Sequence, residues 1–192
     1  MPTAETLLAG VSDWRASENL QEKGTVHIVE AFTAAARGRP DAALDDARSA
    51  LAVADAVGIS HDFLRWGWPL AARSAHELND SSATRELLAM LESYPPGHVA
   101  PVQQAERELV RARMAGVEVG QGADAAFAAA ISSLRELSTP FHLAHGLLDQ
   151  AQYLVSRGEA DEAAAAVKEA REIAARLRCG PLLDRAEDLM PA

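Results

Sequence analysis

This sequence is poor in cysteine, lysine and aromatic residues. It contains one cysteine, Cys179, and two lysines among its 192 residues, and aromatic residues make up 5% of the chain. A single cysteine excludes an internal disulfide and is typical of a reducing compartment. The chain shows no signal-peptide pattern, and no apolar run approaches the ~18 residues that span a bilayer. We therefore expect a cytoplasmic protein that does not enter a membrane.

Positive charge is scarce as well. Lys and Arg total 18 against 28 Asp and Glu, which gives a formal net charge of −10. Surfaces that bind phosphate backbones or anionic lipids collect Lys and Arg on one face. The charge balance therefore argues against nucleic acid and anionic membranes as partners.

Small helix-forming residues are abundant. Apolar residues make up 48% of the chain, and much of this share is alanine. Alanine is the best helix former, and its small side chain lets helices approach closely. Proline and glycine fall mostly in short clusters between long runs that lack them. These features predict an all-α fold, and the length suits a single domain over residues 1–192.

Two stretches near opposite ends of the chain are near-copies. The segment Arg37–Ala43 (RGRPDAA) recurs 120 residues later as Arg157–Ala163 (RGEADEA). In each copy a glycine can take the left-handed conformation that closes a helix, and in the first copy Pro40 suits the first turn of the next helix. The offset equals three periods of about 40 residues, which is in the range of helical-hairpin repeats.

The same spacing predicts four antiparallel helical hairpins with further helices at the ends. The hairpins are expected over residues 25–57, 61–93, 99–137 and 141–177, with turns near Gly38, Leu78, Gly116 and Gly158. An amphipathic helix is expected over residues 3–20, with Leu7, Leu8, Val11 and Trp14 on one stripe, and a capping helix over residues 182–190. Stacked hairpins of this kind form a right-handed solenoid.

The hairpin pattern resembles the tetratricopeptide repeat, in which small residues lie where two helices cross and a glycine lies at the turn. The matching positions are Ala31, Gly38, Ala43 and Ala50 in the first hairpin, and Ala151, Gly158, Ala163 and Ala170 in the last. The period is about 40 rather than the ~34 of the consensus, and Ala and Leu replace most of the consensus aromatic residues.

A closer resemblance is to the repeat arrays at the C-terminal end of large bacterial signalling ATPases, including transcription regulators of the LuxR and maltose-activator type. The segment from Phe141 to Leu148, followed by Arg157-Gly158 and by Ala163 to Leu189, is similar to their closing repeat. This resemblance implies a sensor or scaffold arm that receives a protein or peptide partner or a small-molecule inducer.

The ATPase and output modules of those regulators have no counterpart in this sequence. It has no phosphate-binding Gly-x-x-x-x-Gly-Lys-Ser/Thr motif and no room for a helix-turn-helix beyond the repeats. We therefore expect a non-catalytic binding segment excised from such a regulator. The alternative is a stand-alone array that binds a peptide or small molecule in its concave groove.

Catalytic motifs are incomplete. His76-Glu77 opens like the metalloprotease motif His-Glu-x-x-His, but Asp80 stands where the second histidine belongs. No Gly-x-Ser-x-Gly sequence is present. We expect no enzymatic activity and no cofactor.

Three residues of the last hairpin have the chemistry of metal ligands. His142, His145 and Asp149 share one helical face at positions i, i+3 and i+7. A stable zinc site usually needs a further protein ligand and supporting hydrogen bonds, so we interpret the set as an ordinary polar helix face and expect no metal.

An aromatic segment is the most distinctive local feature. Trp66 and Trp68 lie two residues apart, so one helix cannot point both the same way. We expect one to pack in the core and the other to face a groove or a subunit contact, which leaves a homo-oligomer open.

The first helix of each hairpin is expected to line the concave face of the stack. The residues that the repeat phase places there, together with Trp66, are Arg65, Arg73, His76, Gln103, Glu106, Arg113, His145, Asp149 and Gln152. The arginines form either a basic strip that binds a ligand carboxylate or a set of structural salt bridges, and the sequence leaves both readings open.

Overall fold

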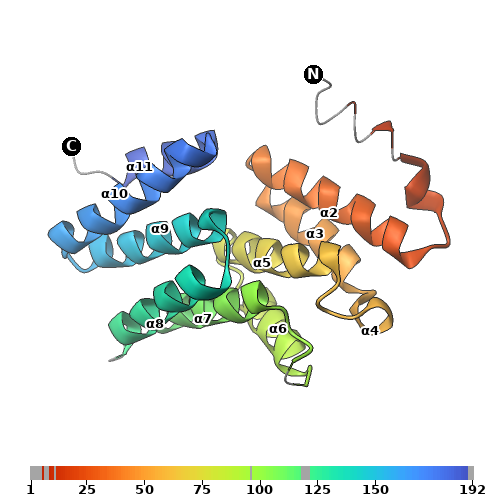
Figure 1. Cartoon of the computed structure of the whole chain (residues 1–192), viewed down its shortest axis with the longest axis horizontal. Helices are drawn as coiled ribbons and strands as arrows, with labels where there is room; N and C mark the ends of the chain where they lie inside the picture. The colour runs from red at the N-terminus through yellow and green to blue at the C-terminus, as the bar shows by residue number, and fades with distance from the viewer. Residues whose placement is uncertain (1–5, 7–8, 11, 96, 118–121, 190–192) are drawn as a thin grey trace. The chain divides into compact units, whose positions relative to one another are not determined.

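The protein is helical throughout the part that the structure describes. The computed structural model describes residues 6, 9–10, 12–95, 97–117 and 122–189. These residues form ten α-helices and one short 3₁₀ helix and include no strand, as the all-α prediction requires (Figure 1). The arrangement of the hairpins as a right-handed solenoid stays a prediction.

The chain divides into two compact units. Unit 1 comprises Met1–Gln103 and unit 2 comprises Gln104–Ala192, so the division falls within one helix, α7. The expectation of a single domain over residues 1–192 stays a prediction. Each unit is described separately below.

Unit 1 contains the first two predicted hairpins. Its elements are η1 (Ser12–Ala16), α2 (Leu20–Ala36), α3 (Pro40–Leu51), α4 (Ala54–Val57), α5 (Asp62–Glu77) and α6 (Ser81–Glu92). Neighbouring helices pack together: α2 against α3, α3 against α5, and α5 against α6. The predicted hairpins over residues 25–57 and 61–93 agree with these elements, except that the first begins five residues earlier.

The start of unit 1 differs from the sequence-based expectation. Helix α2 begins at Leu20 and runs through Gly24, whereas the sequence predicts that one helix ends at residue 20 and the first hairpin begins at residue 25. Helix α2 begins at Leu20 because the Asn19 side chain caps it, accepting a hydrogen bond from the Gln21 N–H at 2.9 Å. Most of the expected helix over residues 3–20, including Leu7, Leu8 and Val11, lies outside the described residues.

Unit 2 contains the other two hairpins and a last helix. The helices are α7 (Pro101–Val117), α8 (Ala123–Leu137), α9 (Pro140–Ser156), α10 (Ala160–Leu177) and α11 (Gly180–Asp188). They agree with the predicted ranges 99–137, 141–177 and 182–190 to within about two residues at each end, the usual uncertainty of helix boundaries. Residues 118–121 of the third turn and residue 190 lie outside the described part.

The two near-copies fold into the same turn. Gly38 has φ +67° and Gly158 has φ +78°, so both take the left-handed conformation. In the first turn the N–H groups of Gly38 and Arg39 bind the carbonyls of Ala35 and Ala34, each at 3.0 Å. The Gly158 turn repeats these bonds at positions 120 residues later, also at 3.0 Å. The prediction that these glycines close helices is therefore confirmed.

Close contact between α2 and α5 organises the core of unit 1. A methyl group added at Gly24 would lie 2.3 Å from the Phe63 ring, and one added at Gly67 would lie 2.4 Å from Ile28 Cδ1. Each helix therefore uses a glycine to admit a bulky side chain of the other. Phe32 is 40% exposed, because the buried stripe of α2 passes through Ile28 and Ala31 beside it.

The core of unit 2 is a continuous apolar cluster. It joins buried residues of α7 to α11, among them Leu109, Phe127, Leu148 and Ile173. Leu182 of α11 lies in the same cluster and is 1% exposed, so the last helix is packed into unit 2.

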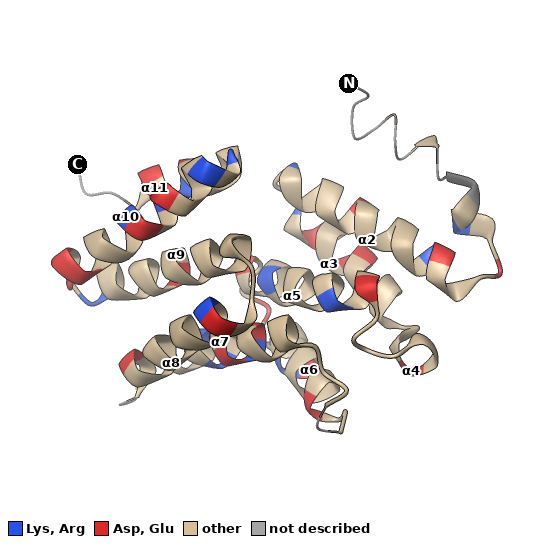
Figure 2. Cartoon of the chain, viewed as in Figure 1, with Lys and Arg blue, Asp and Glu red and all other residues tan. Residues whose placement is uncertain are grey.

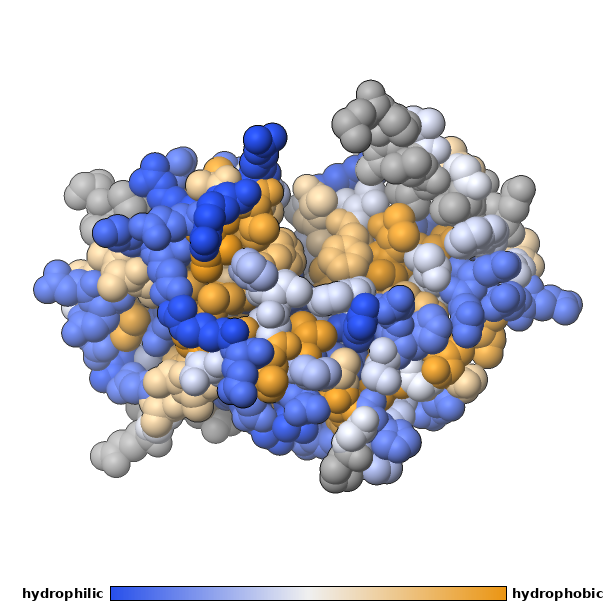
Figure 3. Space-filling model, viewed as in Figure 1, coloured by the Kyte–Doolittle hydropathy of each residue, from blue (hydrophilic) through white to orange (hydrophobic). Residues whose placement is uncertain are grey.

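Charged residues of both signs are interspersed on the helices (Figure 2). Several pairs connect neighbouring helices. Arg48 of α3 donates to Glu86 of α6 at 2.8 Å, and Arg135 of α8 binds Glu169 of α10 through two bonds of 2.5 and 2.6 Å. The visible face carries hydrophobic atoms between the hydrophilic ones (Figure 3). None of the described helices combines the length and the apolar character that crossing a membrane requires.

Replacing Gly24 with alanine tests the α2–α5 contact. The added methyl group collides with the Phe63 ring, which cannot bend away, so we expect Gly24→Ala to lower the free energy of unfolding by about 1–3 kcal/mol despite the better helix propensity of alanine. Chemical denaturation measures this change. Gly180→Ala is the matched control, because a methyl group there meets no atom within 4 Å. Equal stability of both variants would contradict the close contact.

Candidate functional site

An open pocket in unit 1 lies where η1 meets the first turns of α2 and α5. Its volume is about 610 Å³, which is within the ~300–1,000 Å³ typical of small-molecule sites. The lining residues with polar or aromatic side chains include Trp14, Glu22, His61, Asp62, Arg65 and Trp66. Two of the ten residues predicted to bind a ligand, Arg65 and Trp66, are therefore in this pocket.

Two helix starts place these side chains. Asn19 precedes α2 and His61 precedes α5, and both residues line the pocket. The positive ends of two helix dipoles therefore lie at its wall, where they favour a negatively charged group. His61 makes no capping bond with its side chain, whereas its carbonyl accepts from the N–H groups of Leu64 and Arg65 at 2.9 Å. The imidazole is thus left for other contacts.

Arg65 is held at the pocket by its neighbours on α5. Its Nη2 atom lies 2.6 Å from Asp62 Oδ1, and its guanidinium carbon lies 5.0 Å from the centre of the Trp66 ring. This stacking orients the guanidinium group, and not all of its N–H groups are used in these contacts. Its Nε atom and His61 Nδ1 are both buried and have no hydrogen-bond partner among the described residues.

The two tryptophans of α5 have different environments. Trp68 is fully buried, and its indole N–H donates to the Leu87 carbonyl at 2.9 Å. Trp66 is half-buried and lines the pocket. The expectation that one tryptophan packs in the core is confirmed, and a role for Trp66 in binding stays a prediction.

The remaining predicted residues of unit 1 lie away from this pocket. Arg73 is 6% exposed and His76 is half-buried. Gln103 is fully buried: its side chain accepts from the Ala100 N–H at 3.0 Å and donates to the Ile59 carbonyl at 3.0 Å. Gln103 therefore ties the start of α7 to the loop before α5.

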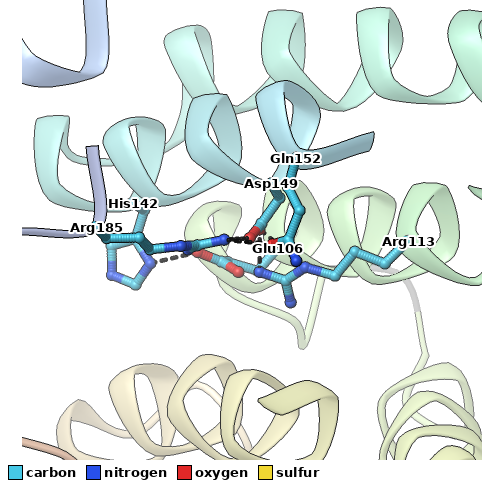
Figure 4. Close-up of polar contacts among 6 residues, drawn as sticks. All are labelled: Glu106, Arg113, His142, Asp149, Gln152 and Arg185. Carbon is cyan, nitrogen blue, oxygen red and sulfur yellow. Dashed lines mark hydrogen bonds and ion pairs between the residues drawn. The ribbon is translucent and has the colours of Figure 1, made fainter. Parts of the chain in front are cut away.

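Arg113 and Asp149, two of the predicted residues of unit 2, form a buried ionic cluster with Arg185 (Figure 4). Asp149 of α9 accepts from Arg113 Nε of α7 at 2.9 Å, and from Arg185 of α11 at 2.6 Å. Arg113 and Asp149 are each 5% exposed, and Gln152 lies at the edge, 3.4 Å from the Arg185 guanidinium. For Arg113, the structure thus favours the salt-bridge alternative over the ligand-binding strip.

The histidines of α9 are not brought together as metal ligands with Asp149. His142 Nδ1 lies 2.5 Å from Glu106 Oε1, and both side chains are buried. The ring of His145 lies edge-on to Phe141, with 4.7 Å between ring centres. The two histidines therefore contact Glu106 and Phe141, whereas Asp149 contacts arginines.

The charges around Asp149 determine its protonation state. Burial by itself would raise the pKa of this carboxyl group, but the positive charges of Arg113 and Arg185 outweigh burial and hold the pKa well below its usual range. Asp149 is therefore ionised at neutral pH and joins α7, α9 and α11 electrostatically.

Three of the residues that matter here were missed from the sequence. None of them lies on the first helix of a predicted hairpin: Trp14 lies in η1, His61 precedes α5, and Arg185 lies in the last helix. A signal was present for Arg185, which is 36 residues after Asp149, just as Asp149 is 36 residues after Arg113.

No protein-family model matches the chain, and no curated protein matches it. The resemblance to tetratricopeptide arrays and to regulatory ATPases stays an interpretation of the residues.

Removing the charge of Asp149 tests the ionic cluster. Asp149→Asn leaves Arg113 buried without a counter-charge, so we expect a loss of about 3–5 kcal/mol in the free energy of unfolding at pH 7. Because the folded pKa is depressed, this contribution is present above about pH 3.9 and is lost as the pH falls through the folded pKa. The difference between wild type and variant should therefore stay constant from pH 7 to about 4 and shrink below.

Denaturation at several pH values measures this difference. Asp184→Asn, an exposed carboxylate on α11, is the control and should leave stability unchanged. A loss of similar size in both variants, or one that fades already near pH 6, would contradict the assignment.

Proposed function

We propose that this chain is a non-catalytic helical binding module that takes a carboxylate-bearing peptide or small molecule at the pocket between α2 and α5. In this proposal the hairpins stack as a right-handed solenoid. The chain serves as the sensor or scaffold segment of a bacterial, cytoplasmic regulatory ATPase or transcription regulator. The pocket supports the proposed binding of a carboxylate ligand. The resemblance of the repeats supports the proposed place in a regulatory protein.

The observation that carries the proposal is a pair of buried nitrogen atoms. His61 Nδ1 and Arg65 Nε belong to pocket-lining residues and make no hydrogen bond within the described chain. Leaving a buried polar atom unsatisfied costs about 1–3 kcal/mol, and native proteins contain few such atoms. A ligand that hydrogen-bonds to them would recover this cost.

The wall of the pocket indicates the chemistry of that ligand. The guanidinium of Arg65 suits a carboxylate, which it can bind through two parallel hydrogen bonds, and two helix starts favour negative charge at the same place. Trp14 and Trp66 add aromatic surface, which is frequent where binding energy concentrates. Glu22 and Asp62 also line the pocket, so a ligand with a single carboxylate next to an apolar or basic group fits better than a polyanion.

Binding of peptides tests the proposal. The probe is a pool of synthetic hexapeptides with free C-terminal carboxylates, compared with the same pool amidated at the C terminus. We expect the protein to retain a subset of the free-acid peptides and to lose this retention at least about tenfold in Arg65→Ala and in Trp66→Ala, since each removes a contact worth ~1.4 kcal/mol or more.

Melting temperatures of the variants separate binding from folding. Arg85→Ala, which removes an exposed arginine of α6 outside the pocket, should bind like wild type. Equal retention of acids and amides, or unchanged binding by both pocket variants, would refute the site.

A further inference from the structure

A second cluster of polar side chains lies between α2 and α3 and belongs to no function described so far. His27 and Glu30 are one helical turn apart on α2, and Asp46 faces them from α3. None of the three lines the α2–α5 pocket. Each is half-buried, with side-chain exposures of 27%, 19% and 31%.

The potential ligand atoms converge without touching. His27 Nδ1 lies 3.6 Å from Asp46 Oδ1 and 4.0 Å from Glu30 Oε2, and all three atoms lie within 4.8 Å of one another. These distances are too long for hydrogen bonds. Ligand atoms around a tetrahedral zinc ion are about 3.4 Å apart, given bonds of ~2.0–2.2 Å. Small side-chain rotations would therefore bring the three atoms to bonding distance of one ion.

Two of these atoms are buried and unsatisfied. His27 Nδ1 and Glu30 Oε2 are shielded from solvent and have no hydrogen-bond partner within the described chain. An imidazole nitrogen and a carboxylate oxygen left in this way are ready ligands, because a metal ion binds through free lone pairs.

Arg15 supports the arrangement from outside. It forms an ion pair with Glu30 through the other carboxylate oxygen, Oε1. This contact leaves Oε2 on the side of His27. Outer contacts that orient a ligating carboxylate are a regular part of metal sites.

We propose that His27, Glu30 and Asp46 bind one divalent transition-metal ion, of which zinc is the best match. The imidazole favours zinc over magnesium or calcium, and three protein ligands leave a fourth position for water. The ion links α2 to α3 and so adds stability to the first hairpin. This proposal replaces the expectation that the chain holds no metal.

Metal titration of the full chain tests the site. Protein stripped with a chelator is titrated with Zn²⁺ by calorimetry and with Co²⁺ by visible absorption, which reports four-coordinate binding. We expect one ion per chain and a melting temperature that rises with Zn²⁺ concentration. His27→Ala and the isosteric Asp46→Asn should each weaken Zn²⁺ binding by more than about tenfold, because the first removes a ligand and the second replaces a carboxylate by a neutral amide, which is a much weaker zinc ligand.

The matched control is His98→Ala, which removes an exposed histidine elsewhere in unit 1 and should bind Zn²⁺ like wild type. Melting curves without metal show whether the variants remain folded, and Asp46→Asn keeps the test valid if His27→Ala does not fold. Absence of Zn²⁺ binding by wild type, or equal binding by wild type and both ligand variants, would overturn the proposal. In that case the three side chains make only the loose polar contacts seen between α2 and α3.

Discussion

Close approach of helices through small residues is the constraint on which this structure depends. Aromatic residues make up only 5% of the chain, so few large side chains are present to fill space between helices. The helices must therefore lie close together for the interior to be densely packed. Gly24 and Gly67 show the solution, since each admits a bulky side chain of the facing helix. Phe63, placed by Gly24, in turn packs beside the His61 ring at 4.7 Å. Because Gly24 has no side chain, Phe63 can occupy this position, where it lines the α2–α5 pocket beside His61.

Charge is used differently in the two units. In unit 1 His61 and Arg65 of the pocket and the three residues of the α2–α3 cluster are half-buried, and some of their polar atoms lack hydrogen-bond partners among the described residues. In unit 2 Glu106, Arg113 and Asp149 are deeply buried, and Asp149 has two arginine partners. Satisfied charges rigidify a structure, whereas unsatisfied ones favour the binding of a further molecule. The unpartnered atoms of the pocket and of the α2–α3 cluster are therefore the places in unit 1 to test for ligands.

Sequence patterns predict the helices of this protein better than its sites. Glycine and proline act locally, so the turn at Gly38 and the start at Pro40 can be read directly from the chain. The apolar stripe of α2 is likewise periodic, but Phe32 lies at the edge of this stripe and is exposed. Which edge of the stripe is buried depends on the neighbouring helix, and periodicity does not identify that helix. Polar residues are harder still. Gln103 binds the Ile59 carbonyl 44 residues away, and Asp46 meets His27 across two helices, so neither contact leaves a local signal.

The Gly38 and Gly158 turns close with the same backbone hydrogen bonds. Residues 34–43 and 154–163 share them, and each segment ends with an alanine N–H bound at 3.1 Å to the carbonyl four residues before it. Exchanging one segment for the other would therefore keep the backbone bonds of both turns.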